Sequence, residues 1–119
     1  MFYTAPFLLY DMKYTHQALD RRHSHRNVFR YVIRFEKHHF GTGVLDFDRA
    51  RRWFTEKYGW SQDVELQAEM HKNKRHHREA YEPDDINPHW AFLSKYDDYR
   101  IYVATEQELS FFILSHPVT

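Results

Sequence analysis

Histidine supplies most of the chemically versatile side chains in this sequence. Ten histidines occur among 119 residues, and imidazole serves both as a metal ligand and as an acid–base group near neutral pH. His23 and His25 are two residues apart, so an extended chain would place both rings on one face. The chain has no H-E-x-x-H motif and no histidine pair at i and i+4. The spacing therefore predicts no metal site, with His23 and His25 as the alternative ligand pair.

Other catalytic patterns are equally nonspecific. The doublets Asp84-Asp85 and Asp97-Asp98 lie in turn-forming sequence, and adjacent residues on an extended chain point in opposite directions. The turn at residues 41–43 lacks the lysine of a phosphate-binding loop and the third glycine of a dinucleotide fingerprint. No cofactor is predicted.

A basic run is the best candidate interaction patch. Residues 71–78, HKNKRHHR, carry four permanent positive charges, and protonated histidines would add more. Such cations could contact phosphate groups. A solvated loop without a partner is the alternative interpretation. The residues assigned to the patch are Lys72, Lys74, Arg75, His76, His77 and Arg78.

The first ten residues form an apolar arm. Pro6, the following Asp11 and the lack of a basic start exclude a signal peptide and a membrane span. An arm this apolar is expected to pack on its own domain or on a second copy. Its expected contact residues are Phe2, Tyr3, Phe7, Leu8 and Tyr10.

Composition limits the class of protein. The absence of cysteine excludes a disulfide framework and thiolate chemistry, so a cytoplasmic location is expected. The net charge of zero argues against a generic nucleic-acid binder. However, residues 13–57 carry eleven Lys and Arg against five Asp and Glu, whereas residues 79–119 carry two against eight. The two regions either pair with each other or form oppositely charged faces.

The last helix is predicted from its start and stop signals. Thr105 to Glu108 reads as a capping box, in which the Thr and Glu side chains each bond a free backbone N–H. Apolar residues then recur at helical spacing, and Pro117 blocks continuation. We expect a helix from Thr105 to His116.

A second helix is predicted at residues 46–58. Asp46 can cap its start, an apolar stripe follows, and Gly59 suits a left-handed residue after its end. The arginines of this segment lie off the stripe, on a face expected to contact solvent.

Aromatic and β-branched runs predict the strands. Residues 90–95 and 99–104 are separated by a turn-forming interval and read as a hairpin. Residues 27–36 suit a strand with one buried face. Residues 64–70 alternate apolar and polar and are predicted as a strand, although their residue types favour helix. A long loop is expected at residues 71–89.

The order of these elements predicts an α+β fold with a ferredoxin-like split βαβ core, an antiparallel sheet carrying two helices. A chain of this length suits one domain. We place that domain at residues 27–119. An N-terminal extension at residues 1–26 precedes it, and a helix at residues 13–26 is one hypothesis for its structure.

The elements also resemble a known class of proteins. The resembling sequence is the helix from Phe47 to Trp60, then an aromatic strand, then the acidic helix start leading into Leu109 to Leu114. This pattern resembles the small proteins of unknown function that tailed bacteriophages encode. The resemblance covers about half the chain. It implies a fold and a viral origin but no site residue.

These observations support three functional hypotheses. The leading one is a small noncatalytic binding or regulatory module in the cytoplasm, that of the host if the protein is viral. It would dock through a charge-polarised surface on a host or viral protein, with nucleic acid as the alternative partner. The second is an assembly subunit that forms homo-oligomers through the apolar arm. The third is a small histidine-dependent enzyme acting on a nucleotide or nucleic acid.

Overall fold

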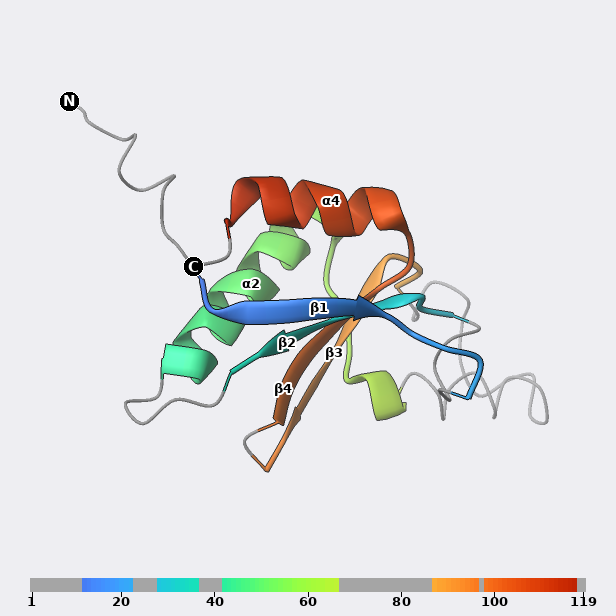
Figure 1. Cartoon of the computed structure of the whole chain (residues 1–119), viewed down its shortest axis with the longest axis horizontal. Coiled ribbons are helices and arrows are strands. Elements are labelled where there is room, and N and C mark those ends of the chain that lie inside the picture. The colour runs from blue at the N-terminus through green and yellow to red at the C-terminus, as the bar shows by residue number, and fades with distance from the viewer. Residues whose placement is uncertain (1–11, 23–27, 37–41, 67–86, 97, 118–119) are drawn as a thin grey trace.

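The protein is described by a computed structural model, which covers residues 12–22, 28–36, 42–66, 87–96 and 98–117. It has an α+β fold with one four-stranded antiparallel sheet of order β1-β2-β4-β3 (Figure 1). The elements are β1 (Tyr14–Ala18), β2 (Tyr31–Phe35), α2 (Thr42–Tyr58), β3 (Trp90–Lys95), β4 (Asp98–Val103) and α4 (Glu106–Ser115).

Helix α2 connects two strands that are not neighbours. Both β2 and β3 pair antiparallel with β4, which lies between them, so β2 and β3 run parallel to each other. Parallel strands need a long crossover connection, and α2 is part of it. The other connections in the sheet join antiparallel neighbours.

The predicted hairpin and final helix are confirmed. Strands β3 and β4 pair from Trp90 opposite Val103 to Lys95 opposite Asp98, and Tyr96 enters the turn with a left-handed φ of 51°. At the start of α4 the Thr105 side chain accepts from the Glu108 N–H, and the Glu108 carboxylate accepts from the Thr105 N–H. The capping box therefore forms as its sequence indicates.

Helix α2 extends further upstream than predicted, to residue 42. Asp46, expected to cap it, is instead a buried residue inside the helix, and its carboxylate accepts from the Lys13 N–H. It therefore joins the helix to the segment entering β1. Gly59 ends the helix with φ 91°, the left-handed conformation predicted from the sequence.

Two further local predictions are wrong. Residues 14–18, considered as part of a helix, form the edge strand β1. The sheet therefore starts upstream of residue 27. Residues 64–66 form a helical turn rather than a strand, because the Asp63 carboxylate accepts from the N–H groups of Glu65 and Leu66 and starts a helix. Residues 67–70 lie outside the described part of the chain.

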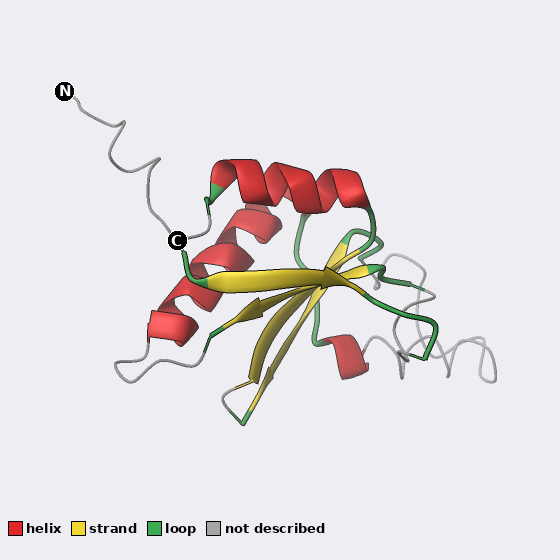
Figure 2. Ribbon diagram, viewed as in Figure 1, coloured by secondary structure: helices red, strands yellow, loops and turns green. Residues whose placement is uncertain are grey.

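Both helices cover the same face of the sheet. Figure 2 shows α2 and α4 on one side and the short turn at residues 64–66 on the other. The main core lies between sheet and helices and is rich in aromatic rings. Phe54 of α2 stacks with Trp90 of β3 and with Phe112 of α4, with ring centroids 5.4 and 5.2 Å apart. These contacts join α2, α4 and the sheet at one point.

A smaller cluster covers part of the second sheet face. Val32, Ala91, Leu93 and Tyr102 pack there with Leu19, Phe29 and Val64. Within the described part of the chain, no helix is long and apolar enough to cross a membrane.

The stack around Phe54 predicts a large loss of stability on truncation. We expect Phe54→Ala to lower the free energy of unfolding by about 3–5 kcal/mol, since a fully buried ring leaves a cavity. Urea unfolding measures this change. Leu114→Ala is the matched control, because that α4 side chain is 81% exposed and its loss should change stability by under about 0.5 kcal/mol. Equal effects of the two substitutions would contradict this packing.

A pH-dependent contact joins β1 to the end of α4. The Tyr14 hydroxyl donates to the His116 carbonyl at 2.5 Å, and burial raises the pKa of Tyr14 to about 12. The folded state therefore favours the protonated phenol more than the unfolded state, whose tyrosines titrate near pH 10. The resulting stability is complete below about pH 10 and is lost as pH rises towards 12.

We expect Tyr14→Phe to flatten the decline of stability between about pH 10 and 12, measured by urea unfolding at each pH. Tyr96→Phe is the control, because this tyrosine is exposed at the hairpin tip and should leave the decline unchanged. An unaltered decline in Tyr14→Phe would show that another group causes it.

Candidate functional site

The predicted site residues all lie outside the described residues. This applies to the basic run, the apolar arm and the alternative metal ligands. The residues concerned are Lys72, Lys74, Arg75, His76, His77 and Arg78, then Phe2, Tyr3, Phe7, Leu8 and Tyr10, and finally His23 and His25. They stay predictions.

The histidines that the structure describes lie on or beside three different elements. His16 is exposed on β1, His89 precedes β3, and His116 follows α4. Burial lowers the pKa of His116, whose ring stacks on Phe112 with centroids 4.7 Å apart. Across the described segments, no group of three or more His, Asp and Glu side chains is placed to hold a metal ion.

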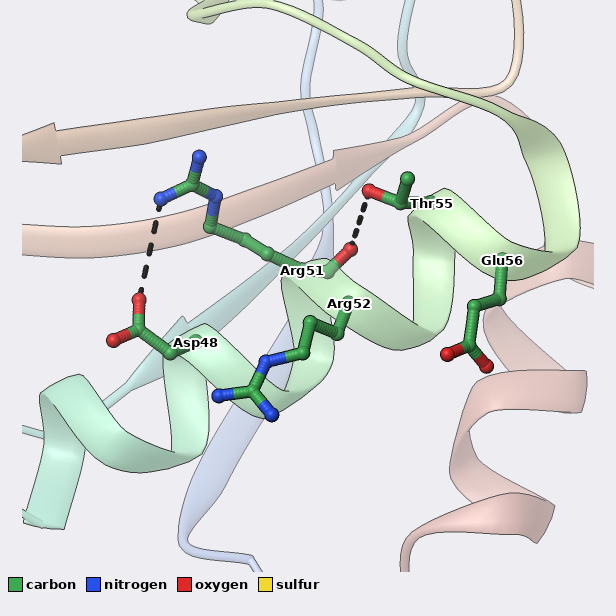
Figure 3. A pocket seen from close by; sticks show the side chains of 5 residues that line it. All are labelled: Asp48, Arg51, Arg52, Thr55 and Glu56. Carbon is green, nitrogen blue, oxygen red and sulfur yellow. Dashed lines mark hydrogen bonds and ion pairs between the residues drawn. The ribbon is translucent and has the colours of Figure 1, made fainter.

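A shallow hollow of about 400 Å³ lies along α2 (Figure 3). Arg51 extends towards Asp48 at 4.0 Å, and its guanidinium carbon lies 4.2 Å from the centroid of the Phe92 ring. The hollow is lined by Asp48, Arg51, Arg52, Thr55 and Glu56. Two acidic and two basic side chains balance here, so the hollow has no strong preference for a charged ligand.

A less balanced group of charges lies on the second sheet face. Arg34 of β2 and Arg100 of β4 are direct partners in the register. Their neighbours Ile33, Phe35 and Ile101 face the helices, so alternation places both arginines on the opposite face. Directly opposite residues have Cα atoms about 5 Å apart. Like charges in such a pair are destabilising unless something compensates them.

Arg100 is well compensated. Its Nε and Nη2 donate to the two Asp98 carboxylate oxygens at 2.8 and 2.7 Å, and Nη1 donates to the Tyr102 hydroxyl at 3.3 Å. The hydrogen bond with Asp98 raises the pKa of Arg100 above its ordinary value, more than burial lowers it. This guanidinium therefore stays charged and is fixed in position.

Arg34 is not compensated by any described residue. Its Nε is shielded from solvent and has no hydrogen-bond acceptor, and no ion pair forms between Arg34 and the described carboxylates. An unsatisfied buried donor costs about 1–3 kcal/mol. The structure thus keeps an unfavourable charged group beside another of the same sign.

One further cation lies on this face. Lys95 follows Leu93 in the alternation of β3, and its ammonium is 3.7 Å from the Glu65 carboxylate. Both side chains are about half exposed, so this pair contributes little to stability. Arg34, Lys95 and Arg100 are called the basic sheet face below.

Sequence reasoning did not find the basic sheet face. The pattern of residue types at 27–36 predicted a strand with one buried face. It contained no information on the register between β2 and β4. Only that register brings Arg34 beside an arginine 66 positions away.

Comparisons with known proteins add no assignment. No protein-family model matches the chain, and neither the curated proteins nor the solved structures compared with it give a match.

The two arginines are predicted to differ in their effect on stability. We expect Arg34→Met to leave the free energy of unfolding unchanged or to raise it, because it removes an unsatisfied donor and a like charge. We expect Arg100→Met to lower it by about 1 kcal/mol, because Asp98 and Tyr102 lose their partner. Urea unfolding distinguishes the two. Arg52→Met, on the exposed face of α2, is the control for loss of a positive charge.

A clear destabilisation by Arg34→Met would contradict the view that Arg34 is uncompensated. It would mean that this guanidinium makes a favourable contact within the folded chain.

Proposed function

We propose that this protein is a small binding module that docks on an acidic surface of a partner protein through the basic sheet face. The observation that carries the proposal is the uncompensated guanidinium of Arg34 beside the fixed guanidinium of Arg100. Because Arg34 Nε is shielded from solvent, a partner carboxylate would bind the two Nη groups, through the two parallel hydrogen bonds that suit the side chains of Asp and Glu. A partner carboxylate would neutralise the charge that the free protein leaves unpaired.

A protein partner is favoured over nucleic acid. Recognition of single-stranded nucleic acid uses exposed aromatic rings for base stacking. On this sheet face the described rings of Phe29 and Tyr102 are both buried, and the Tyr102 hydroxyl is bonded to Arg100. The zero net charge of the chain also gives little general attraction to a polyanion.

The finer fold and the origin are part of the same proposal. A ferredoxin-like chain has the order βαββαβ, with its last strand beside its first. Elements β2, α2, β3, β4 and α4 follow that order, and β1 occupies the place of the last strand. This arrangement supports a ferredoxin-like relationship with permuted element order. The sequence resemblance supports a bacteriophage origin, for which the site of action would be the host cytoplasm.

Binding to a labelled decaglutamate peptide tests the docking proposal, measured by fluorescence anisotropy on the full chain. A single-stranded oligonucleotide of equal charge serves as the second probe. We expect Arg34→Met to weaken peptide binding about tenfold, the effect of losing one charge-assisted contact. Arg52→Met removes the same charge from α2 and should leave binding nearly unchanged.

Three outcomes would overturn the proposal. The wild-type protein could fail to bind the peptide, or both variants could weaken binding equally, which would indicate nonspecific attraction. Tighter binding of the oligonucleotide, with the same dependence on Arg34, would replace the protein partner by nucleic acid.

A further inference from the structure

A second polar cluster lies where α2, β3 and α4 meet, remote in sequence from Arg34. His89 immediately precedes β3, and its Nδ1 lies 2.5 Å from Oε2 of Glu108 in the first turn of α4. The Glu108 residue is only 7% exposed, whereas the His89 side chain is 49% exposed. A buried carboxylate thus orients an imidazole that solvent can reach.

Both oxygens of the Glu108 carboxylate are occupied. Oε1 accepts from the Thr105 N–H and the Thr105 hydroxyl, each at 2.9 Å. Oε2 faces His89 Nδ1. An ionised carboxylate can only accept hydrogen bonds, so the hydrogen on this contact belongs to Nδ1. In the neutral imidazole Nε2 then carries the lone pair, and no described residue bonds it.

The His89 ring is held in place from several directions. It stacks on Tyr58 with centroids 5.2 Å apart and planes 29° apart. Its backbone N–H donates to the Asn87 amide oxygen, and its carbonyl accepts from the Ala104 N–H. The Asn87 amide nitrogen also donates to the carbonyls of Tyr58, Gly59 and Trp60. The imidazole is therefore preorganised.

Tyr58 contributes a neutral partner. Burial and the negative charge of Glu108 both raise the pKa of the Tyr58 phenol, burial more strongly. The phenol accordingly stays protonated near neutral pH, and the ring stacked on His89 is uncharged.

We propose that His89 is a nucleophilic acyl-acceptor site, with Nε2 as the attacking atom, Glu108 as the positioning residue and neutral activated esters as the substrate class. This inference is independent of the docking proposal, because it uses none of the residues of the basic sheet face. A hydrogen-bonded carboxylate stabilises the positive charge that an imidazole acquires when its other nitrogen reacts.

The proposed reaction is ester hydrolysis, and water is its only co-reactant. The Nε2 lone pair forms a bond to the carbonyl carbon of the ester, and the bond from that carbon to the alkoxide or phenolate oxygen breaks. Water then attacks the acylated, positively charged imidazole. Its oxygen and one of its hydrogens become part of the carboxylic acid, its other proton neutralises the released alkoxide or phenolate, and the lone pair returns to Nε2. The Nδ1–H to Glu108 contact persists throughout.

The charges around the site select the substrate class. Glu108 contacts the ring directly, so the negative charge of its carboxylate would repel an anionic phosphoryl donor. A neutral acyl donor avoids this repulsion.

Hydrolysis of p-nitrophenyl acetate by the full chain tests the proposal. If all ten histidines reacted equally, each would supply about a tenth of the rate. We expect His89→Gln to remove more than half of it, and His16→Gln, the exposed control, to remove about a tenth or less. We expect Glu108→Gln to slow the reaction while circular dichroism stays unchanged, because Gln also suits the capping box.

A second measurement uses only the wild-type protein and so does not depend on variant folding. Carbethoxylation by diethyl pyrocarbonate, followed by peptide mapping, ranks the reactivity of each histidine. His89 should react first among His16, His89 and His116. The proposal fails if His16 reacts faster than His89, or if folded His89→Gln loses no more rate than His16→Gln.

Discussion

The contact of Phe54 with Trp90 and Phe112 is the constraint on which the remaining structure depends. Each ring belongs to a different element. Each also lies one helical turn or one residue away from Tyr58, His89 or Glu108, the three residues of the second polar cluster. Phe54 precedes Tyr58 by four residues, Trp90 follows His89, and Phe112 follows Glu108 by four. Because residues four apart share a helix face, the apolar packing also sets the positions of the polar side chains.

The same packing determines which side chains point to the opposite face of the sheet. Once β2 and β4 direct Ile33, Phe35 and Ile101 towards the helices, the intervening residues must point away. Arg34 and Arg100 are therefore kept side by side by the demands of the core. Asp98 offsets the charge of Arg100, and each buried core side chain contributes about 1.5–3 kcal/mol, so the core outweighs the repulsion that remains. An unfavourable surface pair can persist for this reason.

Signals that act over a few residues predicted the structure well. The capping box at Thr105, the turn before β4 and the left-handed Gly59 each depend on neighbouring residues, and each was predicted correctly. The edge strand β1 was missed because its sequence, YTHQA, contains one β-branched residue and buries only Tyr14. The helical turn at residues 64–66 was missed because apolar alternation was given more weight than the helix-starting Asp63.

Long-range pairings could not be obtained from one sequence. The sequence identified Glu108 as a capping residue, which accounts for the hydrogen bonds to one of its two carboxylate oxygens. Capping leaves the second oxygen able to accept from another group, which was the available signal for a further partner. The residues near Glu108 in the sequence gave no indication that this partner is His89, nineteen positions upstream. The register of β2 with β4 is hidden in the same way.

The closeness of the first and last described residues also bears on the order of the elements. The Met12 N–H donates to the Pro117 carbonyl, so the entry to β1 and the exit from α4 lie side by side. A circular permutant could therefore join these ends and open the chain between β1 and β2. Its elements would then read βαββαβ, with the same strands in the same sheet positions. The neighbour relations of this fold do not depend on which strand is made first.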